Sequence, residues 1–348
     1  MSLDNRKKYT IYSYLFAILL AEIVHWGVIE PSRVPTDSMA TTILPGDFIF
    51  ISKLNYGPRL PITLLQLPLV HESLFGFKSY SDIIQLPFFR LPGISSIKRF
   101  DIVVFNNISE LNKPKDIRTN FVKRCIGLPG ENIKMINNEV FINDEKLDSS
   151  KYNIINRYSF TSLKQLSSTW FKNYDIYKYY NAGNTYYVSA TQQSMSKIKK
   201  IWYINNVNIV EYTKQNIFIN QFYPNATFSN FENILIPKKG LKIKIDSQTI
   251  KQYGNTISFY DNDNNNVKII NGKELYIDNN KIEEYVFKQD YYFMLGDNRC
   301  DSSDSRDWGF VPEDHIIGNA IYTFISIDGN QESLYDKLRF NRFLKKLE

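Results

Sequence analysis

Three short segments hold the residues best suited to chemistry. The first is 35–39, in which Ser38 stands shortly before an apolar, strand-like run. The second is 121–130, where Lys123 lies among valine, cysteine and isoleucine. The third is the polar run 296–306, which is rich in aspartate, arginine and serine. A serine nucleophile with a lysine as its general base would unite them, in a variant of the serine–histidine–aspartate triad.

Each of these residues also has an ordinary interpretation. Ser38 could be a turn serine, Lys123 could extend its ammonium group to water, and the charged groups of 296–306 could simply cap one another. Catalysis by Lys123 requires the neutral amine, whereas a free lysine keeps its proton well above neutral pH. Burial among apolar side chains lowers the pKa of a lysine, by several units in extreme cases. The apolar neighbours of Lys123 are consistent with that requirement.

The rest of the composition offers little for other hydrolytic or metal chemistry. The chain has three histidines and two cysteines, and it contains neither a His-Glu-x-x-His nor a Gly-x-Ser-x-Gly motif. The Ser-x-x-Lys matches at 95–98 and 196–199 lack the companion motifs of penicillin-binding enzymes, and we interpret them as chance. We therefore expect no metal and no cofactor. The net charge of +6 is mild and suits an anionic membrane surface better than nucleic acid.

An apolar run at residues 11–29 predicts the element that places these segments near a membrane. Nineteen residues form a helix of about 28 Å, close to the roughly 30 Å of a hydrocarbon core. Three basic residues at 6–8 precede the run, and only Arg33 follows it within twenty residues. The positive-inside rule therefore puts residues 1–10 in the cytoplasm and everything after the run outside. A cleaved signal peptide and a buried soluble helix are the alternatives.

The chain after this anchor is expected to be mainly β. Residues 57–97 combine many leucines and phenylalanines with five prolines, which forbid a second spanning helix. This segment either covers a core or rests on the lipid surface. The tail at 334–347 alternates leucine and phenylalanine with lysine and arginine, and it predicts a terminal helix, solvated or interfacial. Short apolar runs broken by proline, glycine, asparagine and aspartate predict strands at 48–51, 102–105, 133–142, 291–295 and 320–325.

Together these features resemble bacterial type I signal peptidases. The resemblance rests on the ordered combination of the anchor, Ser38-Met39, Lys123-Arg124, 296–299 and 304–306, and residues 56–97 are similar to Bacteroidetes-like versions. The family implies Ser38 as nucleophile and Lys123 as general base. At the other matched positions, the family implies that Thr36 and the Ser38 N–H form the oxyanion hole and that Met39 shapes the substrate pocket. The residues implied to orient the lysine and support it are Ser302, Asp297, Arg299, Asp304 and Arg306.

The same resemblance implies a catalytic core of antiparallel β-sheet with an inserted β-rich lobe. It also implies a membrane-bound serine endopeptidase of the bacterial cytoplasmic membrane, which removes N-terminal signal peptides from exported preproteins. The alternatives are a processing peptidase with one dedicated substrate and an inactive membrane-tethered β scaffold. The oligomeric state is left open. The expected divisions are a cytoplasmic N-terminus (1–10), the anchor (11–29), a first core segment (30–144), the inserted lobe (145–285), a second core segment (286–328) and a basic tail (329–348).

Two features depart from the family pattern or leave a choice open. Asp37 stands where many members have glycine or another small residue, and its charge could raise the pKa of the catalytic lysine. Cys125 and Cys300 lie close in sequence to Lys123 and Ser302, so a disulfide between them is conceivable. Two separate buried thiols are the preferred interpretation.

Overall fold

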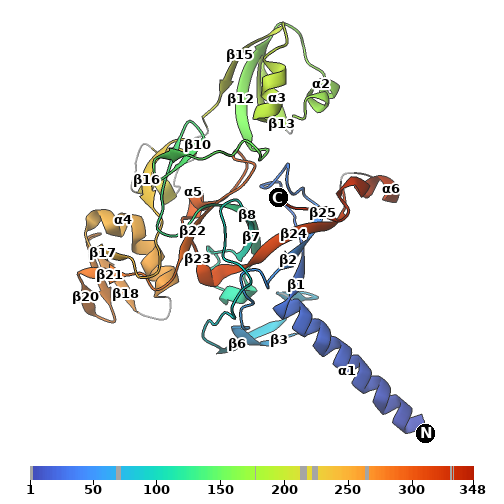
Figure 1. The fold of residues 1–348 in the computed structure, drawn as a ribbon, viewed down its shortest axis with the longest axis vertical. Coiled ribbons are helices and arrows are strands. Elements are labelled where there is room, and N and C mark those ends of the chain that lie inside the picture. The colour runs from blue at the N-terminus through green and yellow to red at the C-terminus, as the bar shows by residue number, and fades with distance from the viewer. Residues whose placement is uncertain are drawn as a thin grey trace. The chain divides into compact units, whose positions relative to one another are not determined.

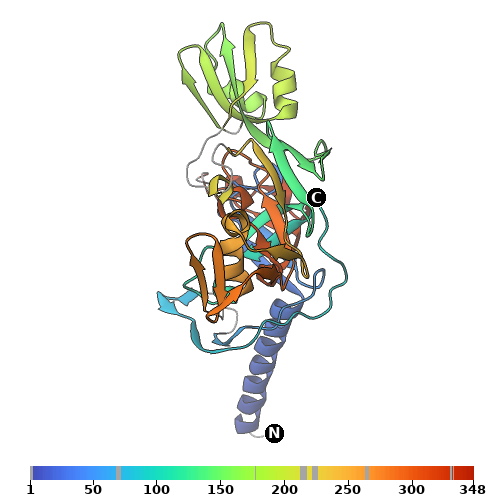
Figure 2. The ribbon, with the colours of Figure 1, turned by 90° about the vertical axis from the view of Figure 1, so that its left-hand side faces the viewer.

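A computed structural model describes residues 3–67, 72–176, 178–211, 218–221, 226–262, 266–329, 331 and 333–348 of the chain. The chain divides into two compact units. The first comprises Met1–Val34, Gly46–Val122 and Asp314–Glu348, and the second comprises Pro35–Pro45 and Lys123–Glu313. Both units are built mainly of antiparallel strands, as the two ribbon views show (Figures 1 and 2), which confirms the predicted fold class.

The chain begins with a long helix, α1 (Leu3–Gly27). Its segment Thr10–Gly27 is long and apolar enough to cross a membrane, and most of its side chains are exposed. The helix ends at Gly27, and Ile29 already pairs with Ser52 as the first residue of β1 (Ile29–Arg33). The helix therefore stops two residues before the end of the predicted span, because strand pairing takes over there.

The first unit is centred on a sheet in which β1, β2 (Asp47–Ser52), β24 (Ile316–Ser326) and β7 (Ile102–Asn106) lie side by side, each antiparallel to its neighbour. The strands predicted at 48–51, 102–105 and 320–325 fall within β2, β7 and β24. All five residues of β7 are buried, while β2 alternates buried and half-buried side chains. This unit also contains η1 (Lys115–Ile117), a 3₁₀ helix of one turn.

The 57–97 segment forms two small hairpins in the first unit. β3 (Thr63–Gln66) pairs with β6 (Tyr80–Gln85), and β4 (Ser73–Leu74) pairs with β5 (Phe77–Lys78), while residues 68–71 lie outside the described residues. Most large apolar side chains of the segment are exposed, so they do not cover a core. They are Leu64, Leu65, Leu67, Phe75, Phe77, Ile83, Ile84, Leu86, Phe88, Phe89, Leu91 and Ile94.

The predicted terminal helix is wrong. α6 (Leu334–Lys337) and η5 (Phe340–Arg342) are single turns, and β25 (Lys345–Lys346) pairs with β24. Arg342 is buried, and its guanidinium group pairs with the carboxylate of Asp47 in β2. A buried, charge-assisted pair and a strand pairing hold this segment on the sheet, and these tertiary contacts override its helical pattern.

The second unit contains several small antiparallel sheets. Their strand orders are β11-β10-β9-β16, β13-β14-β12-β15, β18-β19-β20 and β17-β21, and a further group, β8-β22-β23, carries the site. The bounds are β8 (Asn120–Gly127, which begins in the first unit), β9 (Asn132–Ile136), β10 (Glu139–Ile142), β11 (Glu145–Lys146), β12 (Ile155–Ser162), α2 (Ser168–Asn173), β13 (Lys178–Ala182), β14 (Thr185–Thr191), α3 (Gln192–Ile198), β15 (Ile204–Ile209), η2 (Phe218–Gln221), β16 (Phe231–Leu235), β17 (Lys242–Lys244), α4 (Ser247–Thr256), η3 (Ile257–Asp261), β18 (Val267–Ile270), β19 (Glu274–Ile277), β20 (Asn280–Ile282), β21 (Glu284–Val286), β22 (Tyr291–Leu295), α5 (Ser305–Trp308), β23 (Val311–Pro312) and η4 (Glu313–His315, which ends in the first unit).

The single strand predicted at 133–142 is two strands, β9 and β10, which pair as a hairpin. Asn137 and Asn138 form the turn with φ of 52° and 67°, a left-handed backbone that asparagine tolerates better than most residues. The turn divides the apolar run into two.

The sheet β13-β14-β12-β15 has its own apolar core. Phe160 of β12 and Val188 of β14 are buried against Phe171 of α2 and against Met195 and Ile198 of α3. From Tyr158 on, every second side chain of β12 is buried and contributes to one face of this core, and the two helices cover that face. The sheet is therefore a well-packed element that can hold its edge strand β13 in place.

Candidate active site

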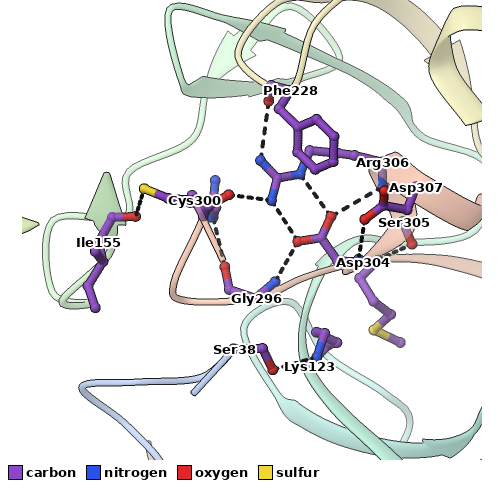
Figure 3. A network of polar contacts seen from close by, with 12 residues as sticks. Ser38, Lys123, Ile155, Phe228, Gly296, Cys300, Asp304, Ser305, Arg306 and Asp307 are labelled. Atoms are coloured by element: carbon purple, nitrogen blue, oxygen red, sulfur yellow. Dashed lines mark hydrogen bonds and ion pairs between the residues drawn. The ribbon is translucent and has the colours of Figure 1, made fainter. Parts of the chain in front are cut away.

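The structure brings Ser38 and Lys123 together in the second unit. Nζ of Lys123 donates a hydrogen bond of 2.7 Å to Oγ of Ser38 (Figure 3), although the two residues are 85 positions apart. Both are buried, with exposed fractions of 6% for Ser38 and 4% for Lys123. Ser38 lies in a turn in which the N–H of Ala40 donates to the carbonyl of Asp37. The predicted pair is therefore in hydrogen-bonding contact.

Strand pairing explains how Lys123 reaches the polar run 296–306. Lys123 lies in β8, and β22 runs antiparallel to β8 with Leu295 opposite Arg124. The chain leaves β22 at Gly296, and the polar loop therefore begins beside the lysine. Both strands are predominantly buried, as their apolar sequences predict.

Burial lowers the pKa of Lys123 from 10.5 to about 8. The charges of Asp304 and Asp297 act in the opposite direction, because a nearby carboxylate favours the ammonium form. The result is an amine that is partly neutral at mildly alkaline pH. It can accept a proton from the hydroxyl group that it contacts.

A buried ion pair joins β8 to the start of the polar loop. Arg124 donates from Nε at 2.8 Å to one oxygen of Asp297 and from one terminal nitrogen at 2.7 Å to the other. Both side chains are 1% exposed, and Thr42 donates a further hydrogen bond of 2.6 Å to the same carboxylate. A two-point contact of this kind fixes both position and orientation. Sequence reasoning gave Arg124 no role, because nothing local shows which carboxylate it pairs with.

A second buried ion pair closes the loop at its other end. Arg306 donates from Nε and a terminal nitrogen to the two oxygens of Asp304, each at 2.8 Å, and Asp304 also accepts from the N–H of Gly296 at 3.1 Å. Burial alone would raise the pKa of Asp304, but the charge and hydrogen bonds of Arg306 outweigh it and lower that pKa. Asp304 caps α5 as well. Nε of Arg299 donates a hydrogen bond of 3.0 Å to the carbonyl of Gly296.

Gly296 allows three segments of the site to approach one another. A Cβ atom at this position would lie 2.2 Å from Oγ of Ser302 and 2.6 Å from the carbonyl oxygen of Ser38. Ser302, which is also buried, is therefore placed against the same point of the loop as the serine turn. Any side chain at position 296 would push these groups apart.

Two predicted residues differ in their exposure. Thr36 is exposed at the surface two residues before Ser38, whereas Met39 is completely buried. The carbonyl of Met39 accepts a hydrogen bond of 2.8 Å from the N–H of Ile43, which stabilises the turn.

Asn298 was missed by the sequence analysis. Its N–H donates to the carbonyl of Ser38 at 3.1 Å, and its side-chain amide donates to the carbonyl of Asp37 at 3.2 Å. The neighbouring carbonyl of Asp297 accepts from the N–H of Ile155, at the start of β12. The backbone of the serine turn, the polar loop and β12 is thus joined by hydrogen bonds. The Gly-Asp-Asn-Arg run at 296–299, in which Asn298 stands, was the available signal.

Cys125 and Cys300 are separate free thiols, and both are buried, which confirms the preferred interpretation. Burial raises the pKa of Cys300 to about 11, so the thiol is protonated at neutral pH. Within the described part of the chain, no group of three or more histidine, cysteine, aspartate and glutamate side chains is arranged to hold a metal ion.

Comparison with known proteins shows the family of this chain. The family of signal peptidases, peptidase S26, matches residues 7–198 and 208–325. Signal peptidase I of Buchnera aphidicola subsp. Acyrthosiphon pisum is 29% identical over 332 residues, covering 94% of this chain and 78% of the relative. That of subsp. Baizongia pistaciae is 25% identical over 336 residues, covering 96% and 81%. That of Rickettsia typhi is 34% identical over 160 residues, covering 43% and 51%. The chain therefore belongs to the S26 family as a bacterial type I signal peptidase, a serine endopeptidase that removes signal peptides from preproteins.

Proposed function

We propose that the chain cleaves preproteins with Ser38 as nucleophile and Lys123 as general base. The observation that carries this proposal is the 2.7 Å hydrogen bond between two buried side chains, one of them a lysine of lowered pKa. The neutral amine accepts the hydroxyl proton while Oγ attacks the carbonyl carbon of the scissile bond. The ammonium then protonates the leaving amine. Lys123 next activates the water that hydrolyses the acyl enzyme.

The surrounding residues are proposed to support these steps. The N–H of Ser38 and the exposed hydroxyl of Thr36 would bind the developing oxyanion, and Ser302 would orient the lysine ammonium. Met39, buried beside the nucleophile, would shape the pocket for the small residue before the cut. The four charged residues of the loop would hold its shape without carrying protons. They are Asp297, Arg299, Asp304 and Arg306.

We propose that the protein is a single-pass protein of the bacterial cytoplasmic membrane. α1 would span the bilayer with the N-terminus in the cytoplasm and the catalytic region on the outer face, because basic residues are concentrated before the span. Residues 145–285 would be an insertion between the lysine strand and the polar loop, as the order of Lys123 and Gly296 in the chain suggests. The lobe would separate the two segments of the catalytic core at 30–144 and 286–328.

The exported preproteins are proposed to share a small-x-small sequence before the cut. In detergent, the wild-type protein is expected to cleave a panel of such preproteins, and mass spectrometry of the product N-termini should place every cut directly after the small residue. Replacing that residue by phenylalanine should block cleavage, because the proposed pocket for a small residue would exclude a large side chain. Cleavage of a single preprotein would indicate a dedicated peptidase, and cleavage of none would indicate an inactive scaffold.

The 57–97 segment is proposed to rest on lipid. Its exposed leucine, isoleucine and phenylalanine side chains lie in the unit that also carries the membrane helix. A fluorophore on a Phe77→Cys variant, in proteoliposomes, is expected to be quenched strongly by brominated lipid. The same fluorophore at Trp202→Cys, which replaces a similarly exposed aromatic of the second unit, is the matched control, and the two native thiols are buried. Equal quenching at both sites would contradict lipid contact by this segment.

A further inference from the structure

Four charged side chains form a row of ion pairs that begins at the residue next to the nucleophile. Nζ of Lys178 lies 2.8 Å from a carboxylate oxygen of Asp37 and 3.1 Å from one of Asp301. Asp301 in turn lies 3.9 Å from a guanidinium nitrogen of Arg157. All four residues belong to the second unit, and all are partly exposed. Lys178 comes from the inserted lobe, whereas Asp37 immediately precedes Ser38.

The position of Lys178 is fixed by the packing of the lobe. It is the first residue of the edge strand β13, where it pairs with Ser189 of β14. The next residue, Tyr179, stacks on Phe171 with ring centroids 3.7 Å apart, and Phe171 belongs to the buried core of the same sheet. The lysine stem therefore starts from a well-held backbone. Its hydrogen bonds with Asp37 and Asp301 raise its pKa, so it is charged throughout the neutral range.

The electrostatic consequence concerns the transition state. Negative charge develops on the substrate oxygen beside the N–H of Ser38 during acylation. A carboxylate on the preceding residue opposes that charge. Lys178 supplies a positive charge in direct contact with the Asp37 carboxylate. We expect the effect of this compensation in kcat. Its effect on folding stability should be small, because exposed ion pairs contribute little to stability.

We propose that Lys178 is a positioning residue of the active site, contributed by the inserted lobe, which neutralises and holds the Asp37 carboxylate beside the nucleophile. This inference rests on the proposed role of Ser38. It gives the lobe a part in the reaction. It also explains how an acidic residue is accommodated next to the serine.

The test is a double-mutant cycle in the full-length, detergent-solubilised protein acting on a preprotein. Lys178→Met is expected to lower kcat about three- to tenfold with KM nearly unchanged, the size expected for one partly screened charge near the oxyanion. Lys178→Arg should retain most of the activity, because it keeps the charge. In an Asp37→Asn background, Lys178→Met should have no further effect, since the charge that it compensates is absent. A structural role of the ion pair itself would lower kcat in the single variant Asp37→Asn as well, whereas charge compensation predicts that Asp37→Asn alone keeps at least the wild-type kcat.

Lys281→Met is the matched control. Lys281 forms a similar exposed pair with Glu274, at 2.6 Å, elsewhere in the second unit, and its loss should leave kcat unchanged. An equal loss of activity from Lys178→Met in the wild-type and Asp37→Asn backgrounds would overturn the proposal, as would wild-type kcat in Lys178→Met. Activity in a Ser38→Ala variant measured in the same assay would instead refute the underlying catalytic assignment, so the two failures are distinguishable.

Discussion

Ser38→Ala is expected to lower kcat for preprotein cleavage by at least about 10⁴-fold, because the variant lacks the atom that forms the acyl enzyme. The fold should survive. The substitution removes one small hydroxyl group, and the turn is held by backbone contacts such as those from Asn298 and Ala40. Cleavage is measured in detergent as the appearance of mature protein, beside a thermal unfolding curve of each variant.

The matched control for this result is Ser303→Ala. Ser303 is exposed and lies in the polar loop 296–306 beside Ser302, so the control tests whether any serine-to-alanine change near the site reduces activity. Its kcat should equal that of the wild type. Substantial cleavage by Ser38→Ala would remove Ser38 from the mechanism, and a comparable loss in Ser303→Ala would show that the assay reports general disturbance of the site.

Lys123→Met is expected to abolish cleavage at every pH, and Lys123→Arg should fail as well. Methionine cannot accept the hydroxyl proton, and guanidinium remains charged. In the wild type, kcat/KM should rise about tenfold per pH unit below pH 8 and level off above it, since only the neutral amine is the base and its pKa is about 8. A flat profile through pH 8, or activity in the arginine variant, would contradict the lysine mechanism.

Lys123→Met is also expected to leave the fold as stable as before, or more stable. Below pH 8 the folded protein holds a buried ammonium group, whose pKa is about 8 instead of 10.5, and this costs free energy that methionine does not. The stabilisation at pH 7 should be on the order of 1–3 kcal/mol. This stabilisation should shrink as pH rises from 8 to 10.5. In that range the folded wild type already holds the neutral amine, and the free energy needed to deprotonate the lysine of the unfolded state falls as pH rises. A lower melting temperature for Lys123→Met at pH 7 would contradict this account.

The sequence alone was sufficient for features that depend on local pattern. The apolar run before Gly27, the period of β2 and the buried strand around Lys123 are all readable from residue type and spacing, because burial of a helix or strand imposes its period on the chain. The motif residues are likewise recognisable. Residues 133–142 show the limit of this approach, since paired asparagines within an apolar run do not by themselves show that the chain reverses there.

Only the tertiary structure decided which distant groups meet. Arg124 pairs with Asp297 173 positions later, Arg342 pairs with Asp47, and Lys178 reaches Asp37 from the edge strand β13. Such pairings depend on the packing of whole sheets, and the sequence around a charged residue does not show which distant residue it pairs with. Residue type and order therefore determined the apolar N-terminal helix, the β architecture and the proposed dyad. The burial that lowers the pKa of Lys123, and the ion pairs that hold the loop around it, arise only when these strands pack together.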